Sequence, residues 1–241
     1  VTPAPFNVRT RVHEYGGRCH TIHDGVLYFA NFADQRLYVQ KIGGEPQPFT
    51  PQAELRYADP VMDAARRRLI CVREDHTRQG MEATNTLVSI DLADGARQQV
   101  LVSGHNFYSD PRLSPDGRRL SWLAWNHPNL PWDGTELYVA ELQADGSLGV
   151  VVLVAGGPEV SIFQPEWSPD GVLYFISDRS GWWNLYRWVG GQAEALHPME
   201  AEFGLPQWVF GMDTYGFASA EQMICTYTQN GEWQLASLDL R

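Results

Sequence analysis

The 241-residue sequence lacks several features that would point to a function directly. It has no run of eighteen apolar residues, so no segment is predicted to cross a membrane as a helix. It is also poor in positive charge, with 18 Lys and Arg against 29 Asp and Glu. The net charge of −11 argues against nucleic acid or a membrane surface as a partner, because both are bound through basic patches.

Sequence signatures of catalysis are absent as well. No G-x-S-x-G nucleophile elbow occurs, and no stretch is predicted to form the helix that would follow one. Gly156-Gly157 and Gly190-Gly191 are interpreted as turns rather than phosphate-binding loops, because no helix is predicted to follow them. The seven His residues do not cluster, since His20 and His23 would point to opposite faces of a strand. We therefore expect no catalytic residue, metal or cofactor in this chain.

Cysteine is scarce and odd in number. Cys19, Cys71 and Cys225 each fall within a predicted strand. Three buried thiols suit a reducing compartment better than a disulfide framework, so the sequence predicts a cytoplasmic protein.

What the sequence does contain is a repeat of about fifty residues. Matching short strands recur at spacings of 50, 50, 48 and 50 residues, and they are marked by Leu37, Leu87, Leu137, Leu185 and Leu235. A period of this length in strand-rich sequence is typical of β-propeller blades, which are four-stranded sheets that cannot bury both faces alone.

Each repeat is predicted to form one blade of an all-β fold. Alternating apolar residues and Gly or Asp-Gly punctuation indicate about five four-stranded blades, at residues 12–50, 57–102, 108–154, 163–196 and 206–241 of a single propeller domain. Ser114-Pro115-Asp116-Gly117 and Ser168-Pro169-Asp170-Gly171 are interpreted as hairpin turns rather than ligand sites, because Pro, Asp and Gly each suit a turn position.

The ends of the sequence predict a fragment. Val1-Thr2-Pro3 resembles Phe49-Thr50-Pro51 at the end of a fourth strand, and Arg241 follows the third strand of the last repeat. We expect five blades cut from a larger ring and forming an open arc, although closure into five blades is the rival outcome. The cut faces and the edge at 233–238 are expected to favour self-association.

Charged and aromatic residues concentrate in the loops at one end of the predicted blades. Blade-to-blade connections and second-to-third loops emerge at the end opposite the Ser-Pro-Asp-Gly turns, and a cluster of such residues there suggests a binding surface. The alternative is that the aromatics cap the core and the charges are merely solvated. The candidate substrate-facing residues are Arg11, His13, Glu14, Tyr15, Trp132, Asp133, Trp182, Trp183, Glu202 and Trp208.

Four of these loops resemble a known family. RVHEYGG at 11–17, HPNLPWDGTELY at 127–138, SDRSGWWNLYR at 177–187 and EFGLPQWVFG at 202–211 are similar to the propeller of bacterial dipeptidyl aminopeptidase/acylaminoacyl-peptidase-like enzymes. These enzymes belong to the prolyl oligopeptidase family of serine peptidases. The resemblance covers essentially the whole chain.

The resemblance implies a seven-bladed propeller joined to a C-terminal α/β-hydrolase domain with a Ser-Asp-His triad, none of which lies in this chain. The propeller would then cover the active site, exclude large folded proteins and contact the N-terminal side of a peptide, while the fragment itself is inactive. The implied partners are the peptide substrate and the parent's own hydrolase domain.

Two questions stay open at this point. Glu14 or Glu202 would pair with a free peptide amine, whereas an apolar wall at Trp132 or Trp208 would suit an acylated N-terminus. A different class of function is a non-catalytic Tol-system-type propeller that serves as a protein-interaction scaffold, since such propellers also use Ser-Pro-Asp-Gly repeats.

Overall fold

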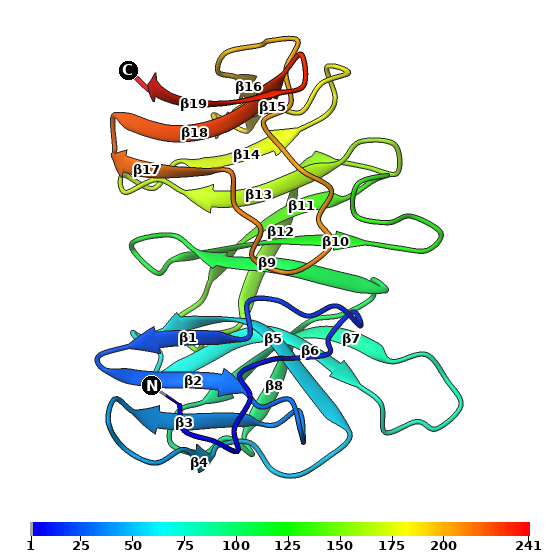
Figure 1. Cartoon of the computed structure of the whole chain (residues 1–241), viewed down its shortest axis with the longest axis vertical. Coiled ribbons are helices and arrows are strands. Elements are labelled where there is room, and N and C mark those ends of the chain that lie inside the picture. The colour runs from blue at the N-terminus through cyan, green and yellow to red at the C-terminus, as the bar shows by residue number, and fades with distance from the viewer. Residues whose placement is uncertain (1) are drawn as a thin grey trace. The chain divides into compact units, whose positions relative to one another are not determined.

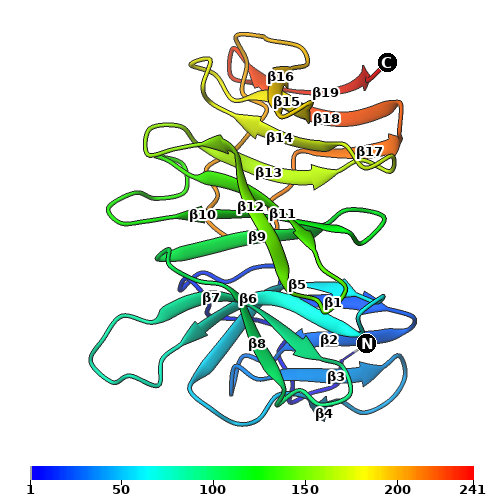
Figure 2. The same ribbon diagram turned by 180° about the vertical axis from the view of Figure 1, so that it is seen from behind.

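The computed structural model describes residues 2–241, and these form strands, turns and irregular segments without a helix. Consecutive strands pair antiparallel into five sheets, coloured from blue to red along the chain in Figure 1 and seen from behind in Figure 2. Four sheets have four strands and the last has three. The all-β, propeller-type architecture predicted from the repeat is thus confirmed. Because the described residues contain no helix, none of them forms an apolar helix of membrane-spanning length.

The strands of each sheet follow one another along the chain. The first sheet contains β1 (His20–His23), β2 (Val26–Ala30), β3 (Leu37–Lys41) and β4 (Gln47–Pro48), and the second contains β5 (Leu55–Asp63), β6 (Arg68–Asp75), β7 (Thr84–Asp91) and β8 (Gln98–Val102). The third contains β9 (Phe107–Leu113), β10 (Arg119–Trp125), β11 (Glu136–Leu142) and β12 (Leu148–Gly156). The fourth contains β13 (Ile162–Trp167), β14 (Leu173–Ser177), β15 (Asn184–Val189) and β16 (Gln192–Ala195), and the fifth contains β17 (Tyr215–Ser219), β18 (Gln222–Gln229) and β19 (Glu232–Asp239).

The chain divides into two compact units. The first comprises residues 1–111 with 208–211, and the second comprises residues 112–207 with 212–241.

Tight turns set the register of the hairpins. Asp24-Gly25, Gly190-Gly191 and Asn230-Gly231 each place two successive residues at positive φ, from 47° to 82°. This is the geometry of a type I′ turn, whose twist matches that of the strands it joins. The β18–β19 pairing is accordingly regular along its whole length, from Gln222 opposite Asp239 to Gln229 opposite Glu232.

The Ser-Pro-Asp-Gly segments are the hairpin turns that the sequence predicts. The Ser114 hydroxyl donates to Asp116 Oδ1 at 2.6 Å, and Gly117 takes a φ of 65°. The hydrogen bond from Ser114 is the main reason that the pKa of Asp116 lies below its ordinary value. These carboxylates therefore serve to close their own turns.

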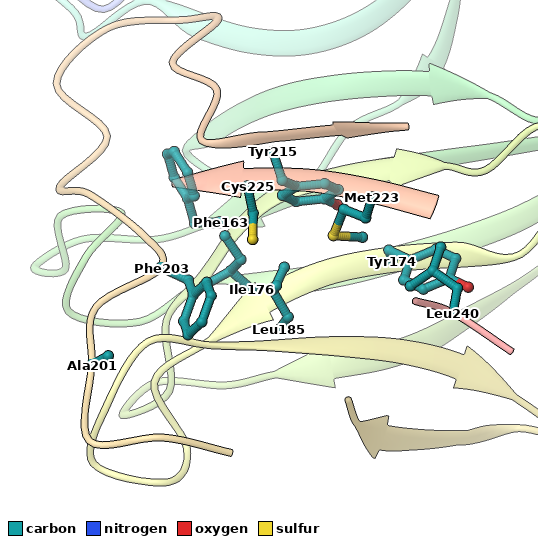
Figure 3. Packing of buried hydrophobic residues seen from close by; sticks show 10 residues of the cluster. All are labelled: Phe163, Tyr174, Ile176, Leu185, Ala201, Phe203, Tyr215, Met223, Cys225 and Leu240. Carbon is teal, nitrogen blue, oxygen red and sulfur yellow. The ribbon is translucent and has the colours of Figure 1, made fainter. Parts of the chain in front are cut away.

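Each unit has an apolar core between neighbouring sheets. In the first unit, Tyr28 and Leu37 of the first sheet pack with Leu69 and Val88 of the second. In the second unit, side chains of the fourth and fifth sheets point toward one another, as Figure 3 shows for Phe163, Leu185 and Met223.

The repeat leucine is not equivalent in all five sheets. Leu37, Leu87, Leu137 and Leu185 are at most 1% exposed, which makes each a core residue of its sheet. Leu235, at the matching position of β19, is 75% exposed. It lies beside Ile224 on the open face of the fifth sheet, where both residues line a shallow hollow of about 400 Å³. The repeat therefore predicts strand position correctly but not burial in the last sheet.

A buried polar contact links consecutive repeats. In β5 and β13 the pairing is interrupted by a bulge, where Asp59 and Gln164 adopt φ values of 52° and 48° just before a proline. Asp59 Oδ2 accepts the Asp110 backbone N–H at 2.7 Å. Gln164 Oε1 likewise accepts the Thr214 N–H at 2.7 Å, and its Nε2 donates to the Tyr215 carbonyl at 2.7 Å. We call these two arrangements the repeat latches.

The latch at Gln164 should be measurable in the stability of the protein. Gln164→Leu keeps the approximate side-chain volume but leaves the buried Thr214 N–H without its acceptor, so the free energy of unfolding should fall by about 1–3 kcal/mol. Urea denaturation of the variant checks this, with Gln234→Leu on the exposed strand β19 as the control. Equal stability of the two variants would contradict the assigned role.

Candidate substrate-facing loops

In the first unit, the candidate residues lie on a tight loop that precedes β1. His13 and Glu14 adopt positive φ values of 52° and 65°, and Gly16 and Gly17 follow with 71° and 101°. Gly17 pairs with Phe210, and a Cβ on Gly17 would lie 2.3 Å from the Phe210 carbonyl oxygen. Only glycine fits this approach, which explains the Gly-Gly pair at the end of the loop.

A buried carboxylate holds this loop against the second sheet. Glu74 on β6 is only 5% exposed, and its Oε1 accepts the His13 backbone N–H at 2.7 Å. Its Oε2 lies 2.9 Å from the His76 ring and 3.6 Å from the Arg56 guanidinium. Glu74 could not be predicted from the sequence, because one acidic residue near the end of a strand has no signature of its own.

His13 is packed between aromatic rings. Its ring centroid lies 5.2 Å from that of Phe107 and 4.8 Å from that of Phe210. Burial lowers the pKa of His13 from 6.5 to about 3, although a hydrogen bond with Asn85 acts in the opposite direction. The imidazole is therefore neutral near pH 7, and its packing indicates a structural role.

The remaining candidates of this unit are exposed. The Glu14 side chain is 80% exposed and lies 3.5 Å from the Arg56 guanidinium. Tyr15 and Trp208 are both exposed and meet edge to face, with ring centroids 6.0 Å apart. The Arg11 guanidinium lies over the ring of Phe32, 4.4 Å from its centroid. The structure thus brings Tyr15 and Trp208 together and places a cation beside Glu14.

In the second unit, Trp132 and Asp133 belong to the loop between β10 and β11. This loop lies at the end of β10 opposite the Asp116-Gly117 turn. Asp133 Oδ2 accepts the Leu130 backbone N–H at 2.8 Å, so this carboxylate closes its own loop. Gly134 lets the loop approach Pro158, whose carbonyl oxygen would lie 2.4 Å from a Cβ at position 134.

Trp183 and Glu202 meet at the end of the fourth sheet. Glu202 Oε2 accepts the Trp183 backbone N–H at 3.0 Å, and the Glu202 backbone exchanges two hydrogen bonds with Thr228. The Trp183 ring packs against Phe163 and against Gly204, where no Cβ could fit. Trp183 is therefore a packing residue, whereas its neighbour Trp182 is 39% exposed.

A second carboxylate accompanies Glu202. Asp178 follows β14 and accepts the Ser161 backbone N–H at 2.8 Å through Oδ1. Burial raises the pKa of Asp178, and the negative charge of Glu202 adds to this effect. Two half-buried carboxylates that repel each other form a site that favours a cation. We call Asp178 and Glu202 the carboxylate pair.

The arrangement has no sign of a metal centre. Among residues 2–241, no group of three or more His, Cys, Asp and Glu side chains is placed to hold a metal ion. The described loops instead offer carboxylates, aromatic rings and guanidinium groups, which are chemistry for binding charged and aromatic ligands.

Comparison with known proteins gives strong matches among solved structures. The chain is similar to a puromycin hydrolase, with 38% identity, a TM-score of 0.91, and coverage of 99% of this chain and 39% of that one. A puromycin-hydrolyzing peptidase of Mycobacterium tuberculosis matches at 36% identity and a TM-score of 0.90, with the same coverage. No family model and no curated protein matches the chain.

More distant structures share the fold alone. Prolyl oligopeptidase B from Galerina marginata matches at 11% identity and a TM-score of 0.67, over 90% of this chain and 32% of that one. TolB from Acinetobacter baumannii matches at 18% identity and a TM-score of 0.54, over 85% of this chain and 46% of that one.

The consecutive antiparallel sheets and these likenesses define the chain as β-propeller sequence. The chain belongs, more narrowly, to the prolyl oligopeptidase family of peptidases, within their propeller domain. It spans 39% of the length of the puromycin hydrolases that it matches.

The buried imidazole of His13 predicts a pH dependence of stability. Below pH 6.5 the unfolded chain binds a proton that the folded chain accepts only near pH 3. Stability should therefore fall as the pH drops through this window, by up to about 1.4 kcal/mol per pH unit.

Urea denaturation at several pH values measures how the free energy of unfolding depends on pH. We expect this dependence to be shallower for His13→Phe than for the wild type. His20→Phe on the exposed start of β1 is the control and should keep the wild-type dependence. Parallel pH profiles for wild type and His13→Phe would contradict the prediction.

Proposed function

We propose that this chain is the gating and substrate-recognition propeller of a serine exopeptidase that acts on peptide N-termini. The similarity to puromycin-hydrolyzing proteins over 99% of the chain supports a peptidase role. The nucleophile, base and oxyanion donors come from the parent's α/β-hydrolase domain, so the chain alone is inactive. Its own contribution is to limit access by large folded proteins and to orient the peptide.

The carboxylate pair is the observation that carries the finer part of the proposal. Burial and, to a smaller extent, the negative charge of Glu202 raise the pKa of Asp178, and a peptide ammonium at this site would offset both effects. It would also donate charge-assisted hydrogen bonds to carboxylates that the Trp183 and Ser161 N–H groups already orient. A free N-terminal amine is thus favoured over an acylated one.

Glu14 is the weaker of the two sequence candidates for this role. Its carboxylate already lies 3.5 Å from Arg56, and its side chain is largely exposed, so water screens its charge. Of the two glutamates, Glu202 is therefore assigned to the amine, and Glu14 provides a matched control.

The non-catalytic scaffold of the Tol type is less well supported. TolB matches at 18% identity, which argues for a common fold and no more. If the chain served as such a scaffold, joining it to its natural continuation would produce no hydrolase activity.

The test uses the complete parent enzyme and paired chromogenic substrates, one with a free amine and one N-acetylated. Glu202→Gln keeps an oxygen that can accept the Trp183 N–H but removes the charge, so kcat/KM for the free-amine substrate should fall about tenfold to a hundredfold. Hydrolysis of the acetylated substrate should change little, and Glu14→Gln should resemble the wild type for both.

Two results would overturn the assignment. A wild-type preference for the acetylated substrate would place an apolar wall, rather than the carboxylate pair, at the N-terminus of the peptide. A loss confined to Glu14→Gln would move the amine site to the first unit.

A further inference from the structure

Two arginines share one aromatic ring in the first unit. Arg9 and Arg11 lie on the segment before β1, and both are exposed. Their guanidinium carbons lie 4.7 and 4.4 Å from the ring centroid of Phe32, in the loop between β2 and β3. Thr10, which separates them in sequence, is only 3% exposed. The two arginines therefore project on one side of this segment, and we call them the arginine pair.

A buried amide fixes the backbone beneath the arginine pair. Gln35 is 8% exposed, and its Oε1 accepts the Arg11 backbone N–H at 2.7 Å. Its Nε2 donates to the Phe32 carbonyl at 2.8 Å. The Arg9 backbone N–H donates to the Ala30 carbonyl at 3.1 Å. Both arginines and the ring thus start from a fixed framework, which reduces the conformational entropy lost when a ligand binds.

No carboxylate of the protein neutralises the arginine pair. Within residues 2–241, neither guanidinium forms an ion pair. The carboxylate of Asp34, in the loop between β2 and β3, instead accepts hydrogen bonds from Asn31 and Tyr38. Other arginines of the same unit do pair with carboxylates, namely Arg18, Arg56, Arg66, Arg68 and Arg97. The positive charge of the arginine pair is therefore open to an external anion.

The two charges of the pair repel each other. Their distances from the ring add up to less than the Debye length of about 10 Å at 0.1 M salt, so screening between them is incomplete. Stacking on Phe32 needs only one guanidinium and does not account for the second. An anion bound to both would offset the repulsion and accept charge-assisted hydrogen bonds. It would also be drawn to a local positive charge on a chain whose net charge is −11.

We propose that the arginine pair is a binding site for a carboxylate of the peptide substrate. The planar guanidinium group matches a carboxylate in shape and can donate two parallel hydrogen bonds to it. The net charge of −11 argues against the phosphates of a nucleic acid as the ligand. That the carboxylate belongs to a peptide rests on the proposed function. Its chemical source is either the C-terminus of the peptide or an acidic side chain.

Equilibrium binding of short peptides to the full chain tests the proposal without requiring catalysis. Every probe is an N-acetylated alanine tripeptide, so no ammonium is present to engage the carboxylate pair. The wild type should bind the free acid at least about tenfold more tightly than the C-terminal amide, and added salt should reduce this preference. An amidated tripeptide with a central aspartate, compared with its asparagine counterpart, tests the acidic side chain as the source.

Three variants assign the preference to named residues. Arg9→Gln and Arg11→Gln should each remove most of the preference for the charged probe, and both positions are exposed, so folding should be retained. Phe32→Leu keeps both charges but removes the ring that holds them, so its preference should be intermediate. Arg97→Gln is the matched control, because it removes the same charge from an arginine that already lies 3.3 Å from Asp94. It should keep the wild-type preference.

Three results would overturn the proposal. The first is a wild type that binds charged and neutral probes equally, and the second is an equal effect of Arg97→Gln and Arg11→Gln. The third is binding of inorganic phosphate that depends on Arg11 without any preference for a peptide carboxylate. A preference within only one probe pair would support the proposal and identify the source of the carboxylate. The proposed function fails separately, if the complete parent enzyme hydrolyses no peptide with a free amine.

Discussion

The contact on which the consecutive sheets depend is a buried side chain that reaches from the first strand of one sheet to the backbone of the next repeat. Asp59 accepts a hydrogen bond from the Asp110 backbone N–H in the first unit. In the second unit, Gln164 forms hydrogen bonds with the backbone of Thr214 and of Tyr215. Apolar packing between sheets is not directional, so it would tolerate sliding of one sheet over another. A buried hydrogen bond between specified atoms does not tolerate such sliding, because a shift of one sheet would leave a buried polar group without its hydrogen-bond partner.

The loops of interest are positioned in the same way. Glu74 holds the 11–17 loop through the His13 N–H, and Glu202 holds Trp183 through another backbone N–H. Glycines at 17, 134 and 204 permit close approach of backbone or ring at each loop. In each unit, these candidate loops are thus irregular segments that are fixed by carboxylates and close packing rather than by secondary structure.

Much of the fold was predictable from sequence because hydrophobic alternation and turn residues recur with the repeat. The strands around Leu37 and Leu185 and the turn at Asp116-Gly117 are examples of elements that could be predicted in this way. The repeat pattern alone does not predict the exposure of Leu235, because burial depends on what lies against a sheet and not on the strand itself.

The candidate site could be predicted only in part from the sequence. The sequence pointed to Glu202, but Asp178 and Glu74 acquire meaning only through partners distant along the chain. The imidazole of His13 packs between two rings, which its loop sequence did not suggest. The repeat latches did leave a sequence signal, since Asp59, Asp110 and Gln164 each precede a proline, but its role is visible only in three dimensions.

The latches also bear on how such a chain can grow or shrink over evolutionary time. Each latch joins an acceptor in one repeat to a donor at the corresponding place in the next, about fifty residues on. A whole repeat that is duplicated therefore brings a matching acceptor and donor with it, and the new unit can join its neighbours without a compensating mutation elsewhere. Propellers with different numbers of blades can arise by this route, because coupling is confined to adjacent units.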